Sequence, residues 1–216
     1  MNTFLRSLLL TGGLAVAALP VSAQTMVVFS NFDTGDTYNA STLNAVTGSD
    51  SILGTAYTQA MSFTASSGGT LSSLELALKS YFGPAAVAVS LCSNAGGAPG
   101  AVLEAWTGPS FTNPAGAIYS YVSTGTPVEL SAGTSYGIVA APGTSTTWAG
   151  WAASNVAQSQ GEVSLYNVNG GAYLTYSAYR GTFRVAVSAI PEPSTYAALF
   201  GVATLGLVAW RRRAKR

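Results

Sequence analysis

Short runs in which apolar and polar residues alternate are the dominant pattern in this chain of 216 residues. In the run TLSSLELALK (70–79), Leu74, Leu76 and Leu78 share one face of an extended backbone, and the residues between them share the other. The run TFRVAVSA (182–189) alternates in the same way. Half-buried antiparallel strands have this period of two. Both runs therefore predict strands with one face on a core.

Similar runs recur along the middle of the chain, separated by Gly, Pro, Asn and Ser. The predicted strands are residues 26–31, 60–65, 70–79, 85–92, 101–106, 117–122, 127–130, 134–141, 147–153, 162–168, 172–177 and 182–189. Many short strands at regular spacing predict an all-β fold, and we expect an antiparallel, jelly-roll-like β-sandwich of about 10–12 strands. The Asn-Gly-Gly sequence at 169–171, before a tyrosine-rich run, predicts a hairpin.

Residues 1–23 do not alternate and have the pattern of a signal peptide. Arg6 supplies a positive charge, residues 8–19 are predominantly apolar, and small residues precede a cleavage position between Ala23 and Gln24. The sequence thus predicts export and removal of this segment by signal peptidase. A short N-terminal anchor is the alternative interpretation, but the apolar core is short and a good cleavage site follows it.

The other end of the chain carries a second apolar segment. From Ser194 to Trp210 an α-helix would extend about 25 Å, near the lower limit for crossing a bilayer. We therefore predict a transmembrane helix at residues 195–210. By the positive-inside rule the basic cluster after it stays in the cytoplasm, which places residues 24–190 on the far side of the membrane. The cluster comprises Arg211, Arg212, Arg213, Lys215 and Arg216.

Charge is sparse in the middle of the chain. Residues 24–190 hold three basic and seven acidic residues, a net charge of −4, and no basic patch, so we expect no nucleic-acid binding. The chain lacks histidine, which excludes Ser-His and Cys-His catalytic arrangements and the usual zinc sites. Cys92, the one cysteine, cannot form an internal disulfide, and we expect it to be buried.

The C-terminal segment begins with a specific motif. Pro191-Glu192-Pro193-Ser194 precedes the apolar segment, and the arginine cluster follows. With an N-terminal signal peptide, this ordered combination resembles the PEP-CTERM sorting signal over residues 191–216. The resemblance implies recognition by exosortase, a membrane protease-transpeptidase of Gram-negative bacteria that make exopolysaccharide. The two prolines oppose a helix and leave an extended peptide for a protease cleft. An ordinary anchor behind a proline-containing linker is the alternative.

The middle of the chain is similar to the choice-of-anchor domains that precede such sorting tails, with type R as the candidate subtype. The similarity rests on the sequences TLSSLELAL, VSLCSNAGGAPGAVLEAW and PVELSAGTSYGIVAA. Members usually carry Trp or another bulky residue after the Tyr of the last sequence, and this chain has Gly137 there. No activity is established for these domains, so the resemblance implies a fold and no reaction.

The middle of the chain also offers two candidate ligand sites. Asp33 and Asp36 flank a turn glycine and offer hard oxygen ligands to calcium, although an Asx turn explains the same sequence. Trp148 and Trp151 are candidates for stacking on sugar rings. At a spacing of three they lie on opposite faces of a strand, so packing in the core is the alternative explanation.

A glycosidase would need two facing carboxylates, but the glutamates are scattered, one to a predicted strand. They are Glu75, Glu104, Glu129 and Glu162. We therefore expect a non-enzymatic structural or adhesive protein without a cofactor. It would be tethered to the inner membrane by its C-terminal helix before processing, and then reside at the cell surface or in the exopolysaccharide matrix. A carbohydrate-binding module that uses exposed Trp or Tyr is the alternative, and a secreted glycan hydrolase is a further one.

The predicted organisation is thus a signal peptide at residues 1–23, an extracytoplasmic β-domain at 24–190 and a sorting signal at 191–216. The expected partners are the export machinery, signal peptidase, an exosortase-type processing enzyme and the membrane. Exopolysaccharide is a further candidate partner.

Overall fold

A computed structural model of the protein describes residues 24–156, 163–175, 179–189, 201–202, 204–206 and 210–214. Residues 24–190 group into a compact unit of their own. The predicted signal peptide, residues 1–23, and much of the predicted transmembrane segment, residues 195–210, lie outside the described residues. Among the residues that are described, no helix is both long enough and apolar enough to cross a membrane.

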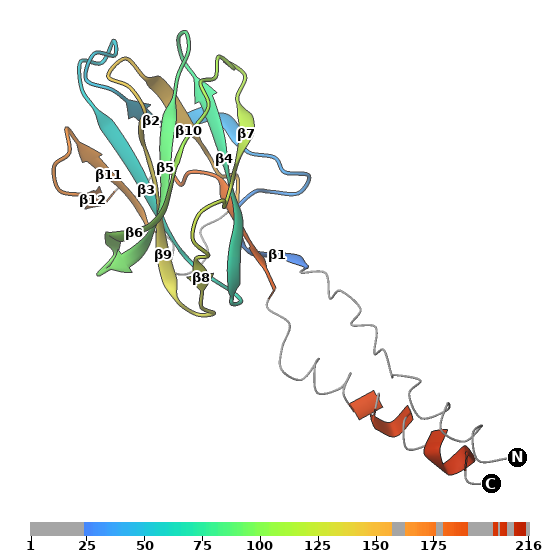
Figure 1. Ribbon diagram of the computed structural model, residues 1–216. Helices are drawn as coiled ribbons and strands as arrows, with labels where there is room; N and C mark the ends of the chain where they lie inside the picture. Colours follow the sequence, from blue (N-terminus) through green and yellow to red (C-terminus); the bar gives the residue numbers. More distant parts are fainter. Residues whose placement is uncertain are drawn as a thin grey trace, which may run out of the picture. The chain divides into compact units, whose positions relative to one another are not determined.

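The unit of residues 24–190 is built from antiparallel strands, whose arrangement Figure 1 shows. The described strands are β1 (Thr25–Ser30), β2 (Asn39–Thr47), β3 (Tyr57–Thr64), β4 (Gly69–Ser80), β5 (Val87–Ala95), β6 (Ala98–Thr107), β7 (Ala117–Val122), β8 (Glu129–Leu130), β9 (Ser135–Pro142), β10 (Trp148–Ala153), β11 (Ser164–Val168), β12 (Leu174–Thr175) and β13 (Phe183–Ser188). The pairings between these strands are antiparallel.

Strand β4 organises one part of the sheet because it is paired along both edges. On one edge it pairs with β13 as far as Leu76 and, from Leu78 onward, with β10. On the other edge it pairs with β8 and then with β7. Strand β1 extends the sheet beyond β13, and β2 extends it beyond β10. Strand β4 is 12 residues long, so it can pair with several shorter strands along its length.

The second part of the sheet has the strand order β6-β5-β9-β3-β11-β12. Among the described strands, a single residue pair, Thr47 with Tyr57, joins it to the first part through β2 and β3. The strands therefore form one continuous hydrogen-bonded sheet, and the Thr47–Tyr57 pair is the link between its two parts. The hydrogen bonding does not divide them into the two separate sheets of the predicted jelly-roll sandwich.

Aromatic side chains from the two parts meet in the core. Phe63 of β3 and Phe183 of β13 pack edge to face with ring centroids 5.8 Å apart, although their strands are not hydrogen-bonded neighbours. Phe29 of β1 contacts both rings. Trp151 of β10 is fully buried and packs edge to face on Phe183. Each such contact contributes about 0.5–1.5 kcal/mol beyond the burial of its area, so these rings fix how the two parts face each other.

Buried polar side chains hold the start of β13 in place. The Asn31 side-chain amide donates to the Gly181 carbonyl oxygen over 2.9 Å, and the Asn31 side-chain oxygen accepts from the Phe183 N–H over 2.7 Å. The Trp151 indole donates to the Thr182 carbonyl oxygen over 2.8 Å. Residue 181 must be glycine because a Cβ would come within 2.5 Å of the indole. Side chains thus satisfy backbone groups at the edge of the ladder.

The all-β prediction is confirmed, with thirteen described strands in place of about 10–12. In β4, Leu74, Leu76 and Leu78 are buried as their alternation predicts. The Asn-Gly-Gly turn joins β11 to β12, and Asn169 and Gly170 both have the positive φ that such a hairpin turn requires. The sequence analysis misses β2, whose sequence NASTLNAVT contains few apolar residues and no clear alternation.

Replacing Asn31 by alanine should destabilise the domain, because the Gly181 carbonyl and the Phe183 N–H would lose their partner. Unsatisfied buried groups cost about 1–3 kcal/mol each, so we expect the free energy of unfolding to fall by about 3 kcal/mol. Denaturant unfolding followed by tryptophan fluorescence measures the change. Asn155→Ala, at an exposed position, is the control. Equal stability of the two variants would contradict this role of Asn31.

Candidate functional site

The residues predicted for export and sorting lie largely outside the described residues. Ala23, residues 191–194, Lys215 and Arg216 are not described, whereas Arg211, Arg212 and Arg213 are exposed on a short helical stretch. Their predicted roles in cleavage, sorting and membrane orientation stay predictions.

The two ends of the β-domain lie side by side. Gln24 is exposed just before β1, and its carbonyl oxygen accepts a hydrogen bond from the Ala189 N–H over 2.9 Å. This bond continues the ladder in which β1 pairs with β13. The predicted signal peptide and sorting tail therefore join the domain at neighbouring points.

The candidate calcium ligands, Asp33 and Asp36, lie in a tight turn between β1 and β2. The Asp33 carboxylate accepts a hydrogen bond from the Thr34 N–H over 2.7 Å, and the Asp36 carboxylate pairs with the Arg184 guanidinium. Arg184 also lies 3.4 Å from the Glu75 carboxylate. Among the described residues, no group of three or more His, Cys, Asp and Glu side chains is placed to hold a metal ion. The two aspartates thus remain an untested candidate site for calcium.

Trp148 and Trp151 lie on opposite faces of β10, as their spacing predicts. The interpretation of Trp151 as a glycan contact is wrong, because its ring is enclosed in the core. Trp148 is half-buried and stacks on both Tyr81 and Phe82, at centroid distances of 5.4 and 5.2 Å. Phe82 is 72% exposed, so this aromatic cluster reaches the surface at the end of β4.

The described glutamates have separate partners on different strands. Glu162 lies outside the described residues. Each described glutamate makes an ion pair or a hydrogen bond with another side chain, as is typical of carboxylates on the surface of a sheet. The pairs are Glu75 with Arg184, Glu104 with Ser123 and Glu129 with Thr70.

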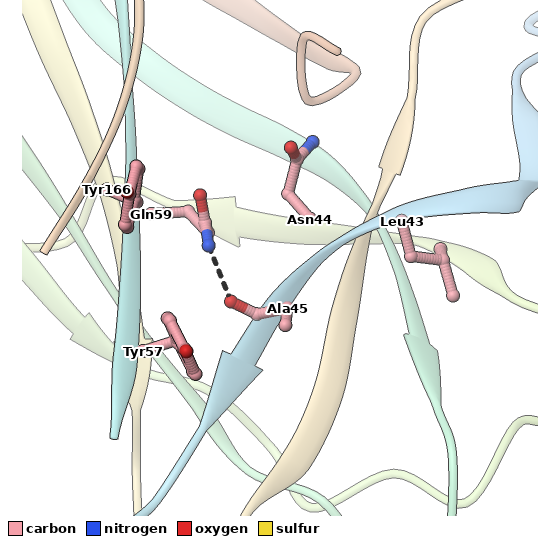
Figure 2. Close-up of a pocket in the computed structure, with 6 residues that line it drawn as sticks. All are labelled: Leu43, Asn44, Ala45, Tyr57, Gln59 and Tyr166. Atoms are coloured by element: carbon pink, nitrogen blue, oxygen red, sulfur yellow. Dashed lines mark hydrogen bonds between the residues drawn. The ribbon is translucent and has the colours of Figure 1, made fainter. Parts of the chain in front are cut away.

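A pocket of about 250 Å³ lies where β2 and β3 diverge. The strands separate beyond their single pair because β2 continues along β10, whereas β3 continues along β9 and β11. The Gln59 side chain spans the gap, since its amide donates to the Ala45 carbonyl oxygen over 2.7 Å. Figure 2 shows this bond among the lining residues, which are Leu43, Asn44, Ala45, Tyr57, Gln59 and Tyr166.

Two buried carboxamides in this pocket have oxygen atoms without a partner. Asn44 is 3% exposed and Gln59 is 5% exposed. The Asn44 amide donates to the Trp151 carbonyl oxygen over a long 3.4 Å, but Asn44 Oδ1 and Gln59 Oε1 accept no hydrogen bond from the described residues. An unsatisfied buried acceptor costs about 1–3 kcal/mol. These oxygens are therefore the strongest candidates for contacts with a ligand.

Two tyrosines complete the lining. Tyr166 of β11 is the direct cross-strand partner of Gln59, so their side chains share one face of the sheet. Tyr57 lies at the point where β2 and β3 meet, and both tyrosines are half-buried. None of the six lining residues carries a charge. The pocket can accept hydrogen bonds and present aromatic surface, but its described lining offers a charged ligand no counter-ion.

The sequence analysis does not identify this pocket. Its residues come from three strands, and one of these, β2, is not predicted. Asn44 and Gln59 belong to no motif. The available signal is the polar Gln59 at an inward position of a strand whose next inward residues are Met61 and Phe63. A polar side chain in such a series indicates either a buried network or a site.

Calcium should leave the thermal stability unchanged, because the Asp36 carboxylate is already paired with Arg184. Thermal unfolding with excess calcium and with a chelator tests this expectation in the wild-type protein and in Asp36→Asn. Asp50→Asn, at another exposed carboxylate, is the control. A calcium-dependent rise in the unfolding temperature that only Asp36→Asn abolishes would instead assign a calcium site to this turn.

The Cys92 thiol should be unreactive in the folded protein. Cys92 is 2% exposed, and burial raises the pKa of its thiol, so the neutral form persists to higher pH than in the unfolded chain. Reaction with iodoacetamide, followed by mass spectrometry, should be slow in buffer and rapid in denaturant. Rapid labelling of the folded protein at neutral pH would show that the thiol is accessible.

Comparison with models of protein families matches residues 189–213 to the PEP-CTERM protein-sorting motif. No curated protein matches the chain significantly. The matched segment holds the proline motif, the apolar segment and the first arginines, in the order that the sequence analysis describes. The similarity of residues 24–190 to choice-of-anchor domains is not shown. The chain carries the PEP-CTERM sorting motif of an exported protein that is sorted at the membrane and processed by exosortase.

Proposed function

We propose that this protein is a non-enzymatic structural or adhesive component of the cell surface, or of the exopolysaccharide matrix, of a Gram-negative bacterium. The observation that carries the proposal is the sorting motif at residues 189–213, which directly follows an all-β domain. A sorting motif determines where a protein is delivered, so the molecular role belongs to the domain that the motif delivers. In this proposal that domain is of the choice-of-anchor type, and its two strand groups, which are joined through β2 and β3, form the two layers of a jelly-roll-like sandwich.

The proposed topology assigns a role to each end of the chain. Residues 1–23 are a removable signal peptide, residues 195–210 are a membrane helix before processing, and residues 211–216 stay in the cytoplasm. Exosortase acts at the proline motif, residues 191–194. The hydrogen bond between Gln24 and Ala189 is compatible with this topology, because it places the two ends of the domain next to each other.

The chemistry of the domain favours a non-enzymatic role. A retaining or inverting glycosidase needs two carboxyl groups about 5–9.5 Å apart. The described glutamates lie on β4, β6 and β8, and each is engaged with its own partner: Glu75 with Arg184, Glu104 with Ser123 and Glu129 with Thr70. The sequence has no histidine to act as a general base. Binding, rather than catalysis, is the role that the remaining polar groups of the domain support.

Processing is tested by mass spectrometry of the mature C-terminus in a host with exosortase. We expect the wild-type protein to lose the residues beyond the proline motif, because this extended segment suits a protease cleft. A double variant, Pro191→Ala and Pro193→Ala, should keep them. Pro127→Ala, at an exposed loop position of the domain, is the matched control and should be processed normally. A wild-type protein that ends at Arg216 would leave a plain membrane anchor and contradict the proposal.

A further inference from the structure

We propose that the pocket between β2 and β3 binds the ring of a neutral sugar. The inference deepens the adhesive role and rests on it, because it names the class of ligand to which the exported domain would adhere. It differs from a glycan contact through Trp148 or Trp151 in both its residues and its location. The geometry of the pocket carries it in three steps.

The first step concerns the unpaired oxygens. Asn44 Oδ1 and Gln59 Oε1 are buried acceptors without a described donor. In Figure 2 the Gln59 oxygen lies on the side of the carboxamide opposite the bond that its amide makes to Ala45. Carboxamide oxygens accept hydrogen bonds from hydroxyl groups. A ligand that supplies hydroxyl donors would recover the desolvation cost that these groups impose on the folded protein.

The second step concerns the size of the pocket. A volume of about 250 Å³ is well above the share of one water molecule, about 30 Å³ in the liquid. It lies just below the range of about 300–1,000 Å³ that is typical of pockets for drug-sized molecules. A pocket of this volume fits one sugar ring rather than a long buried chain. A glycan would therefore be held by a single residue or by its end.

The third step concerns the aromatic rings and the charge. Tyr57 and Tyr166 flank Gln59 from two strands, and aromatic side chains pack well against the apolar face of a sugar ring. None of the described lining residues is charged, so among them an ionised sugar would lose its hydration without gaining a counter-ion. The combination of carboxamide acceptors, tyrosine rings and neutral walls selects a neutral, hydroxyl-rich ligand.

The surface cluster around Trp148 fits a sugar less well. Tyr81 and Phe82 both stack on the Trp148 ring, at interplanar angles of 26° and 12°, so the protein itself already covers that ring. The buried side-chain oxygens that lack partners among the described residues include two in the pocket and none from these three residues. The cluster therefore serves as the control surface in the experiment.

Sugar binding is tested by saturation-transfer NMR on the purified full-length protein, in a detergent without a sugar headgroup. The probes are glucose, galactose, mannose and N-acetylglucosamine, with glucuronate as the charged comparison. We expect transfer to at least one neutral sugar and none to glucuronate. Asn44→Leu and Tyr166→Leu should each weaken binding about tenfold, the equivalent of one lost contact. Phe82→Ala should bind as the wild type does.

Thermal unfolding separates a binding role of Asn44 from a structural one. Leucine has nearly the shape of asparagine and removes the unpaired oxygen at the loss of one long 3.4 Å bond to the Trp151 carbonyl oxygen, so Asn44→Leu should unfold at nearly the same temperature as the wild type. A lower unfolding temperature would mean that Asn44 supports the fold and would count against the site.

Three outcomes of the NMR assay would also overturn the proposal. They are no transfer to any neutral sugar, undiminished binding in both pocket variants, and loss of binding in Phe82→Ala. The assay needs no exosortase, so its failure would leave the sorting role intact. An unprocessed C-terminus would likewise leave sugar binding intact.

Discussion

This structure depends on one constraint, which is that the backbone N–H and C=O groups along each strand need hydrogen-bond partners. Strands β2 and β3 find these partners on different neighbouring strands. They share the pair Thr47–Tyr57 and then part, β2 along β10 and β3 along β9 and β11. The parting of the strands leaves an opening that backbone bonds cannot close. The Gln59 side chain closes part of it through its bond to Ala45, and the remainder is the pocket.

Polar groups in the interior of this domain fall into two kinds. Asn31 uses both ends of its carboxamide to hold the backbone around β13, so its burial stabilises the fold. Asn44 and Gln59 use their amides but leave their oxygens unpaired. The first kind explains how a domain without a disulfide keeps a unique register, and the second costs stability that a ligand in the proposed site would recover.

Alternation was enough to predict most of this fold from the sequence, because residues such as Leu74, Leu76 and Leu78 are buried on one side of their strand. It could not predict β2, where inward Asn44 interrupts the apolar series. The candidate site was missed for the same reason, since it exists only where β2 meets β3 and β11. The sequence left open which of Trp148 and Trp151 lies in the core, because spacing alone tells which residues oppose each other, not which face is buried. The sorting motif was readable because its elements are contiguous in the chain.

Because Gln24 and Ala189 are adjacent, the β-domain begins and ends at the same place on its surface. A domain whose ends meet can be spliced between different flanking segments, or even permuted, without breaking its internal pairing. The sorting signal of the C-terminal segment and the surface chemistry of the domain can therefore evolve independently, because only two neighbouring strand ends connect the domain to its flanking segments.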